Sequence, residues 1–394
     1  MPPEGSGKMV IDLGPSHPAM HGTVKMRVVV DGETLERADV DVGYLHRAFE
    51  KSCENATWTM VFPYTDRLNY VSPFINNVGY AMAVEKLMGL KVPERADYLR
   101  VISSEISRIA DHCTCVGAAT MELGGFSGML YLIEARDLVW DITEELCGAR
   151  LTVSYCRIGG VVADLPEGFE ERTKKRLDRV VQLMDDADKL LTKNNIFIQR
   201  MKGLGAMSKE DAVDWGWTGP CLRSTGVPYD VRLAHPYCVY DRLDFAVPVG
   251  ENGDNYDRYL VRMQEIRESR RMILQCLDQI KATPPAIMLD DPRVKLPEKS
   301  KVHTAIEELM NHFKLIMEGI QVPKGEAYAY VEGANGELGF YVVSDGGGKP
   351  WKIRCRPPCW PITSSLQHLL EGVMLADVVP TFGSINMIGG ECDR

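Results

Sequence analysis

The sequence predicts an α+β fold, with a small antiparallel sheet first, a bundle of long helices at the centre and a small mixed region last. Apolar and polar residues alternate near the N-terminus, apolar residues recur every three or four positions through the middle, and short alternating runs return after about residue 324. This order is typical of the α+β class. We therefore expect an N-terminal β region over 1–56, a helical core over 57–322 and a C-terminal α+β region over 323–394.

The first expected elements are strands at 24–28 and 38–42, within a stretch from residue 8 to 43 that alternates throughout. Asp31-Gly32 lies between them and is a common pair at a hairpin turn. These residues predict a small antiparallel sheet.

Long helices are expected next. The clearest covers residues 93–124, where Gly124-Gly125 is a plausible stop signal. Similar periodicity predicts helices at 71–89, 127–149, 167–193, 254–281 and 300–319, and several helices of this length favour a bundle. The apolar positions that define the 93–124 helix are Tyr98, Val101, Ile102, Ile106, Ile109, Cys113 and Val116.

The last part of the chain predicts short strands at 326–331, 338–343 and 351–356, with the turn-rich stretch 345–350 between the second and the third. We find no internal repeat and no low-complexity linker.

Composition narrows the function. The 394 residues carry a formal net charge of -10, which argues against nucleic acid as the main partner because phosphate binding needs a basic surface. No stretch approaches the roughly 18–20 apolar residues of a membrane span, and the N-terminus lacks the features of a signal or transit peptide. We expect contact with a membrane through partners only. The 11 cysteines lack the dense spacing of a secreted scaffold, so we expect reduced thiols.

Motifs for nucleotides and metals are missing. No Gly-x-Gly-x-x-Gly follows an expected strand, and the Ser/Thr of a phosphate loop is absent after Gly346-Gly347-Gly348-Lys349. No Cys-x-x-Cys occurs, and Cys113 and Cys115 point to different sides of their helix. We expect this chain to bind no nucleotide, metal or other cofactor by itself.

Two segments carry candidate site residues. His17 and His21 lie in a Pro/Gly-rich loop, where they could bind a metal, cap backbone groups or present an imidazole to a ligand. Tyr70 ends the segment 62–70, where a tyrosine is usually a half-buried packing residue. The residues alone do not decide between these alternatives.

Ordered blocks of sequence from about residue 12 to the C-terminus identify a family. The chain resembles the quinone-site (D) polypeptide of the proton-pumping NADH–quinone oxidoreductase, respiratory complex I. The matching blocks are Gly14–Gly22, Gly43–Arg47 with Glu50-Lys51, Tyr64–Tyr70, Arg157–Val161, Leu222–Val227 with Asp230 and Arg232, Pro323–Glu326, Gly336–Gly339, Ser344–Gly347 and Asp393-Arg394.

The resemblance implies a fold like that of the nickel–iron hydrogenase large subunit. Hydrogenases hold their metals with two Cys-x-x-Cys pairs, and this chain has neither. In the family that space is the head-group end of a quinone cavity shared with the neighbouring B polypeptide of the complex. The loop over residues 14–22 is the family's quinone-head loop.

The resemblance also implies roles for three residues at that cavity. Tyr70 and His21 match the two quinone-head ligands. Two-electron reduction makes both quinone oxygens strongly basic, and a phenol and an imidazole can each donate a proton at neutral pH. Glu122 matches a carboxylate, usually that of Asp, which orients the histidine ring and stabilises its charged form. The alternative for Glu122 is a solvated residue in a helix's last turn.

Arg47 and Arg67 match arginines near the terminal tetranuclear iron–sulfur cluster, which the neighbouring B polypeptide binds.

At two positions this sequence departs from the residue that is usual in the family. Thr152 occupies a position where many relatives have a cluster-proximal histidine, so we expect a weaker pH dependence of the cluster potential. Asn386 stands where Asp is usual and removes one charge near the old metal site.

The implied function is the quinone-site subunit of a complex-I-like enzyme. It passes electrons from the neighbouring cluster to a membrane quinone, ubiquinone or menaquinone, coupled to proton translocation. Expected partners are subunits B, C, H and I and lipid quinone, in the peripheral arm on the cytoplasmic side of the inner (cell) membrane. The alternative is a non-catalytic scaffold subunit of this complex or of a related membrane-bound hydrogenase-like one. The electron donor, the quinone type and the pumped ion stay open.

Overall fold

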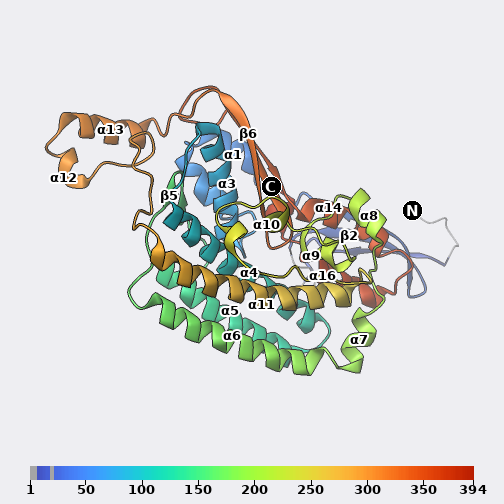
Figure 1. Cartoon of the computed structure of the whole chain (residues 1–394). Coiled ribbons are helices and arrows are strands. Elements are labelled where there is room, and N and C mark those ends of the chain that lie inside the picture. The colour runs from blue at the N-terminus through green and yellow to red at the C-terminus, as the bar shows by residue number, and fades with distance from the viewer. Residues whose placement is uncertain (1–6, 18–21) are drawn as a thin grey trace.

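The computed structural model describes residues 7–17 and 22–394. Long helices run side by side through one half of the molecule, and the sheets and the C-terminal helices lie beside them (Figure 1). The fold is mixed, with small antiparallel sheets and many helices, as the sequence predicts. None of the described helices combines the length and apolar character needed to cross a membrane.

The N-terminal sheet has the antiparallel order β1 (Met9–Leu13), β2 (Lys25–Asp31) and β3 (Thr34–Asp41). The expected hairpin is confirmed, because Asp31 pairs with Thr34 across a turn in which Gly32 has φ 63°. Alternate residues of β2 are buried and join an apolar cluster with the C-terminal helices. This sheet therefore packs against the end of the chain.

The central bundle is built from α3 (Pro73–Met88), α4 (Glu94–Glu122), α5 (Phe126–Cys147), α6 (Phe169–Leu191) and α11 (Asn255–Gln279). Helix α4 packs against α5 and α11, and α5 packs against α6 (Figure 1). All five lie within two residues of the expected ranges. The apolar faces of α4, α5, α6 and α11 share one core, whereas α3 belongs mainly to a second core with the C-terminal sheet. Helix α4 is the element that reaches from this core to the site described below.

The C-terminal sheet is β6 (Gly325–Glu332), β7 (Glu337–Ser344) and β8 (Lys352–Arg356), again antiparallel and in chain order. Helix α3 packs on β6 and β7. Four short helices follow: α14 (Cys359–Ser364), α15 (Leu366–Leu369), α16 (Val378–Ile385) and α17 (Gly389–Cys392). Helix α16 packs against α4 and α11, which places this segment at the end of the bundle.

One expected helix is wrong in detail. Residues 300–319 form two helices, α12 (Lys299–Val302) and α13 (Ile306–Met317), which extend away from the body (Figure 1). Between them the Thr304 hydroxyl bonds to backbone carbonyls of α12, and Ala305 is extended with φ -126°. A threonine hydroxyl that competes for helix carbonyls favours such a break.

The remaining elements are short. They are α1 (Phe49–Asn55), α2 (Phe62–Thr65), α7 (Asn195–Met201), α8 (Lys209–Asp214), α9 (Gly219–Ser224), α10 (Val231–Ala234), β4 (Cys156–Arg157), β5 (Gly160–Val161) and the 3-10 turns η1 (Thr59–Val61), η2 (Tyr240–Arg242), η3 (Ile280–Ala282) and η4 (Leu375–Asp377).

Candidate functional site

Tyr70 lies in the turn between α2 and α3 and is half-buried. Buried amides hold this turn in place. Asn76 Nδ2 on α3 donates to the Asn69 carbonyl at 2.9 Å, and Asn69 Oδ1 accepts from the Val71 amide at 3.2 Å. The phenol is thus carried by a rigid segment rather than a free loop.

A cavity of about 200 Å³ opens beside Tyr70. It is smaller than the roughly 300–1,000 Å³ of pockets that enclose drug-sized ligands, so it suits the head of a ligand rather than the whole of a long one. Its walls come from the turn at Tyr70, from α4 and from α16 with the residues after it. The lining residues are Gly22, Tyr70, Val71, Thr114, Cys115, Ala118, Phe382, Gly383, Asn386, Met387 and Ile388.

A buried carboxylate stands behind the cavity. Asp111 of α4 is fully buried and accepts hydrogen bonds from Asn69 Nδ2 at 2.8 Å and from Asn386 Nδ2 at 2.7 Å. Burial, with smaller contributions from Cys359 and Asp111, raises the pKa of Tyr70 above its ordinary value of 10, and Arg47 only partly opposes this. Tyr70 therefore keeps its proton at neutral pH until a strong base forms beside it.

Glu122 ends α4 and is partly buried. Its carboxylate lies against Gly383 of α16, where a Cβ would stand only 2.1 Å from Glu122 Oε2. Glycine at 383 thus lets the carboxylate approach the helix that lines the Tyr70 cavity. His21 falls outside the described residues, so its pairing with Glu122 stays a prediction.

Arg47 and Arg67 are brought together. Arg47 Nη2 donates to the carbonyl of Arg67 at 2.5 Å and to that of Gly390 at 2.9 Å, while Arg67 Nη1 donates to the Pro63 carbonyl at 2.6 Å. Burial and, more weakly, the nearby Arg67 lower the pKa of Arg47, although Tyr70 and Asp393 oppose the shift. An arginine remains charged after such a shift, so two fixed positive charges lie on the side of the molecule that carries the Tyr70 turn.

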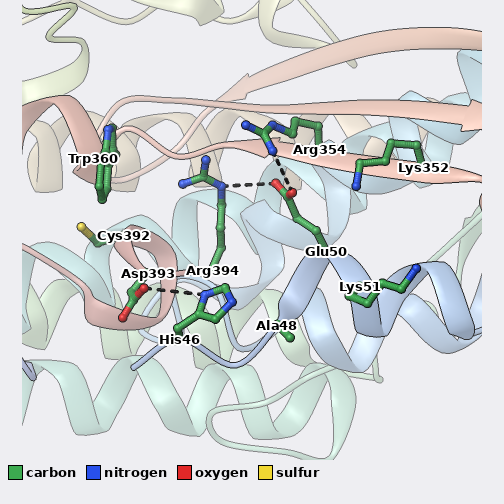
Figure 2. Close-up of a pocket in the computed structure, with 10 residues that line it drawn as sticks. All are labelled: His46, Ala48, Glu50, Lys51, Lys352, Arg354, Trp360, Cys392, Asp393 and Arg394. Carbon is green, nitrogen blue, oxygen red and sulfur yellow. Dashed lines mark hydrogen bonds and ion pairs between the residues drawn. The ribbon is translucent and has the colours of Figure 1, made fainter. Parts of the chain in front are cut away.

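A second cavity, an open groove of about 370 Å³, is lined by Cys392 at the end of α17 and by the residues after it, and is shown in Figure 2. Its walls are charged. Glu50 accepts from Arg354 and Arg394, each at 3.3 Å, and the Asp393 carboxylate faces His46 at 3.7 Å. The groove is open and polar, whereas the Tyr70 cavity is smaller, more enclosed and lined mainly by apolar surface. The Tyr70 cavity is therefore the better place for a ring-shaped head group.

The structure shows what surrounds Asn386 and Thr152, the two positions at which this chain differs from the usual residue of the family. The side-chain amide of Asn386 bridges Asp111 and Asn335, with 2.6 Å to Asn335 Oδ1. Thr152 is partly buried two residues before Ser154, whose hydroxyl bonds to the buried Asp66 at 2.6 Å. The effect of Thr152 on a cluster potential stays a prediction.

Asp111, Asn335 and Cys359 did not stand out in the sequence. Asp111 gives no signal, because on a helical wheel it lies roughly opposite the apolar positions that define the 93–124 helix, and only the structure shows that it is buried. The other two come from a turn and a short helix with no distinctive spacing.

Comparison with known proteins identifies the family of this chain. Residues 122–394 match the model of the family described as the 49 kDa subunit of the respiratory-chain NADH dehydrogenase. This match covers more than half of the chain, and the chain belongs to that family.

The relatives agree along nearly the full length. The chain is 59% identical over 392 residues to the "D 1" polypeptide of the NADH-quinone oxidoreductase of Anaeromyxobacter dehalogenans, covering 100% of this chain and 91% of the relative. It is 56% identical to the polypeptide of the same name from Sorangium cellulosum, covering 99% and 96%. It is also 56% identical to the D polypeptide of the NADH-quinone oxidoreductase of Myxococcus xanthus, covering 98% and 93%.

Proposed function

We propose that this chain is the quinone-site subunit of an NADH–quinone oxidoreductase and that the Tyr70 cavity receives the quinone head. The chain is part of an oxidoreductase complex and a peripheral subunit of it, as membership of the family indicates. The main observation in support of this site is that the phenol of Tyr70, which keeps its proton at neutral pH, lies on the wall of a small enclosed cavity.

Tyr70 and His21 hold the two quinone oxygens and protonate them as electrons arrive. The raised pKa of Tyr70 supports this order of events, because the phenol gives up its proton only to the strongly basic oxygen of a reduced quinone. Glu122 keeps the His21 ring oriented and stabilises its charged form. The closeness of Glu122 to the α16 wall supports that role.

Electrons come from an iron–sulfur cluster held by the neighbouring B polypeptide, beside Arg47 and Arg67. The fixed charges of these arginines favour reduction of that cluster. In this proposal the chain itself holds no cofactor, and its fold is like that of the hydrogenase large subunit. Its other partners are subunits C, H and I, and the assembly lies on the cytoplasmic side of the inner membrane. Proton loss from Tyr70 and from the His21–Glu122 pair leaves negative charge in a poorly solvated cavity, and this charge drives proton translocation in the membrane subunits.

The test is Tyr70→Phe in the assembled complex. Loss of a positioned proton donor costs about 10²–10⁴-fold in rate, so quinone reduction falls by that order. Electron transfer to an artificial acceptor that draws electrons upstream stays unchanged. Tyr64→Phe is the matched control, because Tyr64 lies on the same segment and is exposed. Unchanged quinone reduction in Tyr70→Phe would remove the proton-donor role and leave a scaffold subunit.

A further inference from the structure

A buried chain of side chains leads away from the wall of the Tyr70 cavity. Asn386 on that wall donates to Asn335 Oδ1 at 2.6 Å, and Asn335 Nδ2 lies 3.4 Å from Cys359 Sγ. The Cys359 thiol donates to Glu391 Oε2 at 3.0 Å. Asn335, Cys359 and Glu391 are each 1% exposed. We call these four residues the amide–thiol chain.

Glu391 ends this chain without a cation. Among the described residues, no Lys, Arg or His lies within ion-pair distance of its carboxylate. Arg356 acts on Glu391 through its charge, while its guanidinium is bonded to the carbonyls of Glu337 and Gly216 and to the Thr218 hydroxyl. A buried carboxyl group in this position favours its neutral form.

The pKa of Glu391 reflects these surroundings. Burial and, more weakly, the charge of Asp111 raise it, the hydrogen bonds from Cys359 and Asn335 and the charge of Arg356 lower it, and the net result is a pKa of about 7. The titratable and charged groups that face Glu391 are Asp111 on α4, Cys355 and Arg356 on β8, Cys359 on α14 and Cys392 on its own helix. Glu391 can therefore change its protonation state in the neutral range.

Glu391 also lies between two spaces. Ile388, just before α17, lines the Tyr70 cavity, whereas Cys392 at the end of α17 lines the open groove. Figure 2 shows Cys392 and Asp393 on the wall of that groove. One turn of helix thus separates the enclosed cavity from a groove that water can fill, and Glu391 is part of that turn.

We propose that Glu391, oriented by Cys359, stores a proton behind the Tyr70 cavity. When Tyr70 gives its proton to a reduced quinone, negative charge is left in the cavity, and the Glu391 carboxylate binds one proton from water in the groove. When Tyr70 regains its proton, Glu391 releases the stored one to the groove. No electron moves at Glu391, and one O–H bond forms and then breaks. The inference rests on the proposed function, because it requires that Tyr70 loses a proton.

Cys359 sets how strongly Glu391 holds this proton. A thiol that donates to the carboxylate stabilises the charged form. Loss of that donor in Cys359→Ala should raise the pKa of Glu391 by about one unit, because a hydrogen bond to a charged group is worth that order. Cys359→Ser keeps a donor and should leave the pKa nearly unchanged. Glu391 is a positioning residue in this scheme, since it acts on the cavity through its charge.

The experiment records the infrared difference spectrum between the oxidised and the quinol-reduced assembled complex, at several pH values around neutrality. The wild type should show the carbonyl band of a newly protonated carboxyl group, and Glu391→Gln should lack it. The pH at which the band appears should shift upward in Cys359→Ala and stay in place in Cys359→Ser. Glu50→Gln is the matched control and should keep the band, because Glu50 lies in the groove and is paired with two arginines.

Persistence of the band in Glu391→Gln, or the same pH dependence in Cys359→Ala and Cys359→Ser, would overturn the proposal. If Glu391→Gln fails to assemble, the two Cys359 variants decide alone. The proposed function is tested by a separate experiment, and unchanged quinone turnover in Tyr70→Phe would contradict it.

Discussion

Two buried polar regions of this chain are built on opposite principles. One is an ionic network between α4, α9, α10, α11 and β6, made of Glu105, Arg108, Arg223, Arg232, Glu265 and Glu332. Its charges are paired: Arg223 contacts Glu265 at 2.6 Å and Glu332 at 2.8 Å. The other is the amide–thiol chain, whose only ionisable carboxyl group faces a thiol.

The difference appears in the protonation of the two regions. Burial alone would raise the pKa of Glu265, but Arg223 overrides it and holds that pKa far below the ordinary range. Glu105 behaves in the same way beside Arg108 and Arg232. In contrast, the hydrogen bonds from Cys359 and Asn335 and the charge of Arg356 offset the burial of Glu391 only in part, and its pKa lies near 7. In the ionic network, Glu265 and Glu105 therefore stay charged beside their arginines, although burial and the nearby Asp230 raise the pKa of Glu332. The amide–thiol chain, in contrast, can respond to charge in the cavity.

The largest effect is expected from breaking the ionic network. Arg223→Met leaves Glu265 and Glu332 buried without their main partner, which costs about 3–5 kcal/mol of stability. We expect little of this variant in the purified complex and a clear fall in its unfolding temperature. Arg150→Met is the control. Arg150 pairs with three acidic residues but is exposed, where such pairs contribute about 0–1 kcal/mol. Equal losses in both variants would contradict the comparison.

The next effect concerns stability against pH. The pKa of Glu391 is about 7 in the folded chain and near the ordinary 4.5 when unfolded, so the folded state holds an extra proton between these values. Stability therefore falls as pH rises through this window, by at most about 3 kcal/mol. Glu391→Gln does not titrate and should unfold at a higher temperature than the wild type at pH 8, but at a similar one near pH 5. A constant difference at both pH values would exclude this titration.

A smaller effect follows from giving the amide–thiol chain a second charge. Asn386→Asp places a carboxylate oxygen where an amide now donates to Asp111 at 2.7 Å, so the two carboxyl groups must share a proton. We expect quinone turnover to fall about tenfold at alkaline pH and much less at acid pH. Asn386→Ala removes the amide without adding charge, and its turnover should be reduced equally at every pH. Parallel pH profiles in the two variants would count against the shared proton.

The smallest effect is a loss of quinone turnover that tests whether the position of Glu122 matters. Gly383→Ala puts a methyl group 2.1 Å from Glu122 Oε2 and pushes the end of this flexible side chain away. Displacement of a positioning group lowers catalysis, so we expect a loss of about three- to tenfold in quinone turnover with upstream electron transfer intact. Gly117→Ala on α4 is the control, because its methyl group meets only ordinary contacts. Equal turnover in the two variants would argue against a role for the position of Glu122.

The sequence predicted the long helices because each carries its own apolar stripe, as α4 does. It missed the break between α12 and α13, which depends on where one threonine hydroxyl bonds. The candidate site was reached by family resemblance, and only the structure shows Tyr70 on a cavity. Cys359 and Glu391 lie 32 positions apart, and no local pattern indicates that a fold will bury them together.

The contacts around α17 also govern when the site can exist during synthesis. The backbone amide of Leu45 bonds to Asp393 across 348 positions, and Arg47 reaches Gly390 across 343. Contacts between such distant residues form slowly, because a long loop must close first. The Tyr70 turn leaves the ribosome more than 300 residues before the wall provided by residues 382–388. A nascent chain therefore carries the phenol on an open surface while these residues are made and acquires an enclosed cavity only once α16 and α17 have docked.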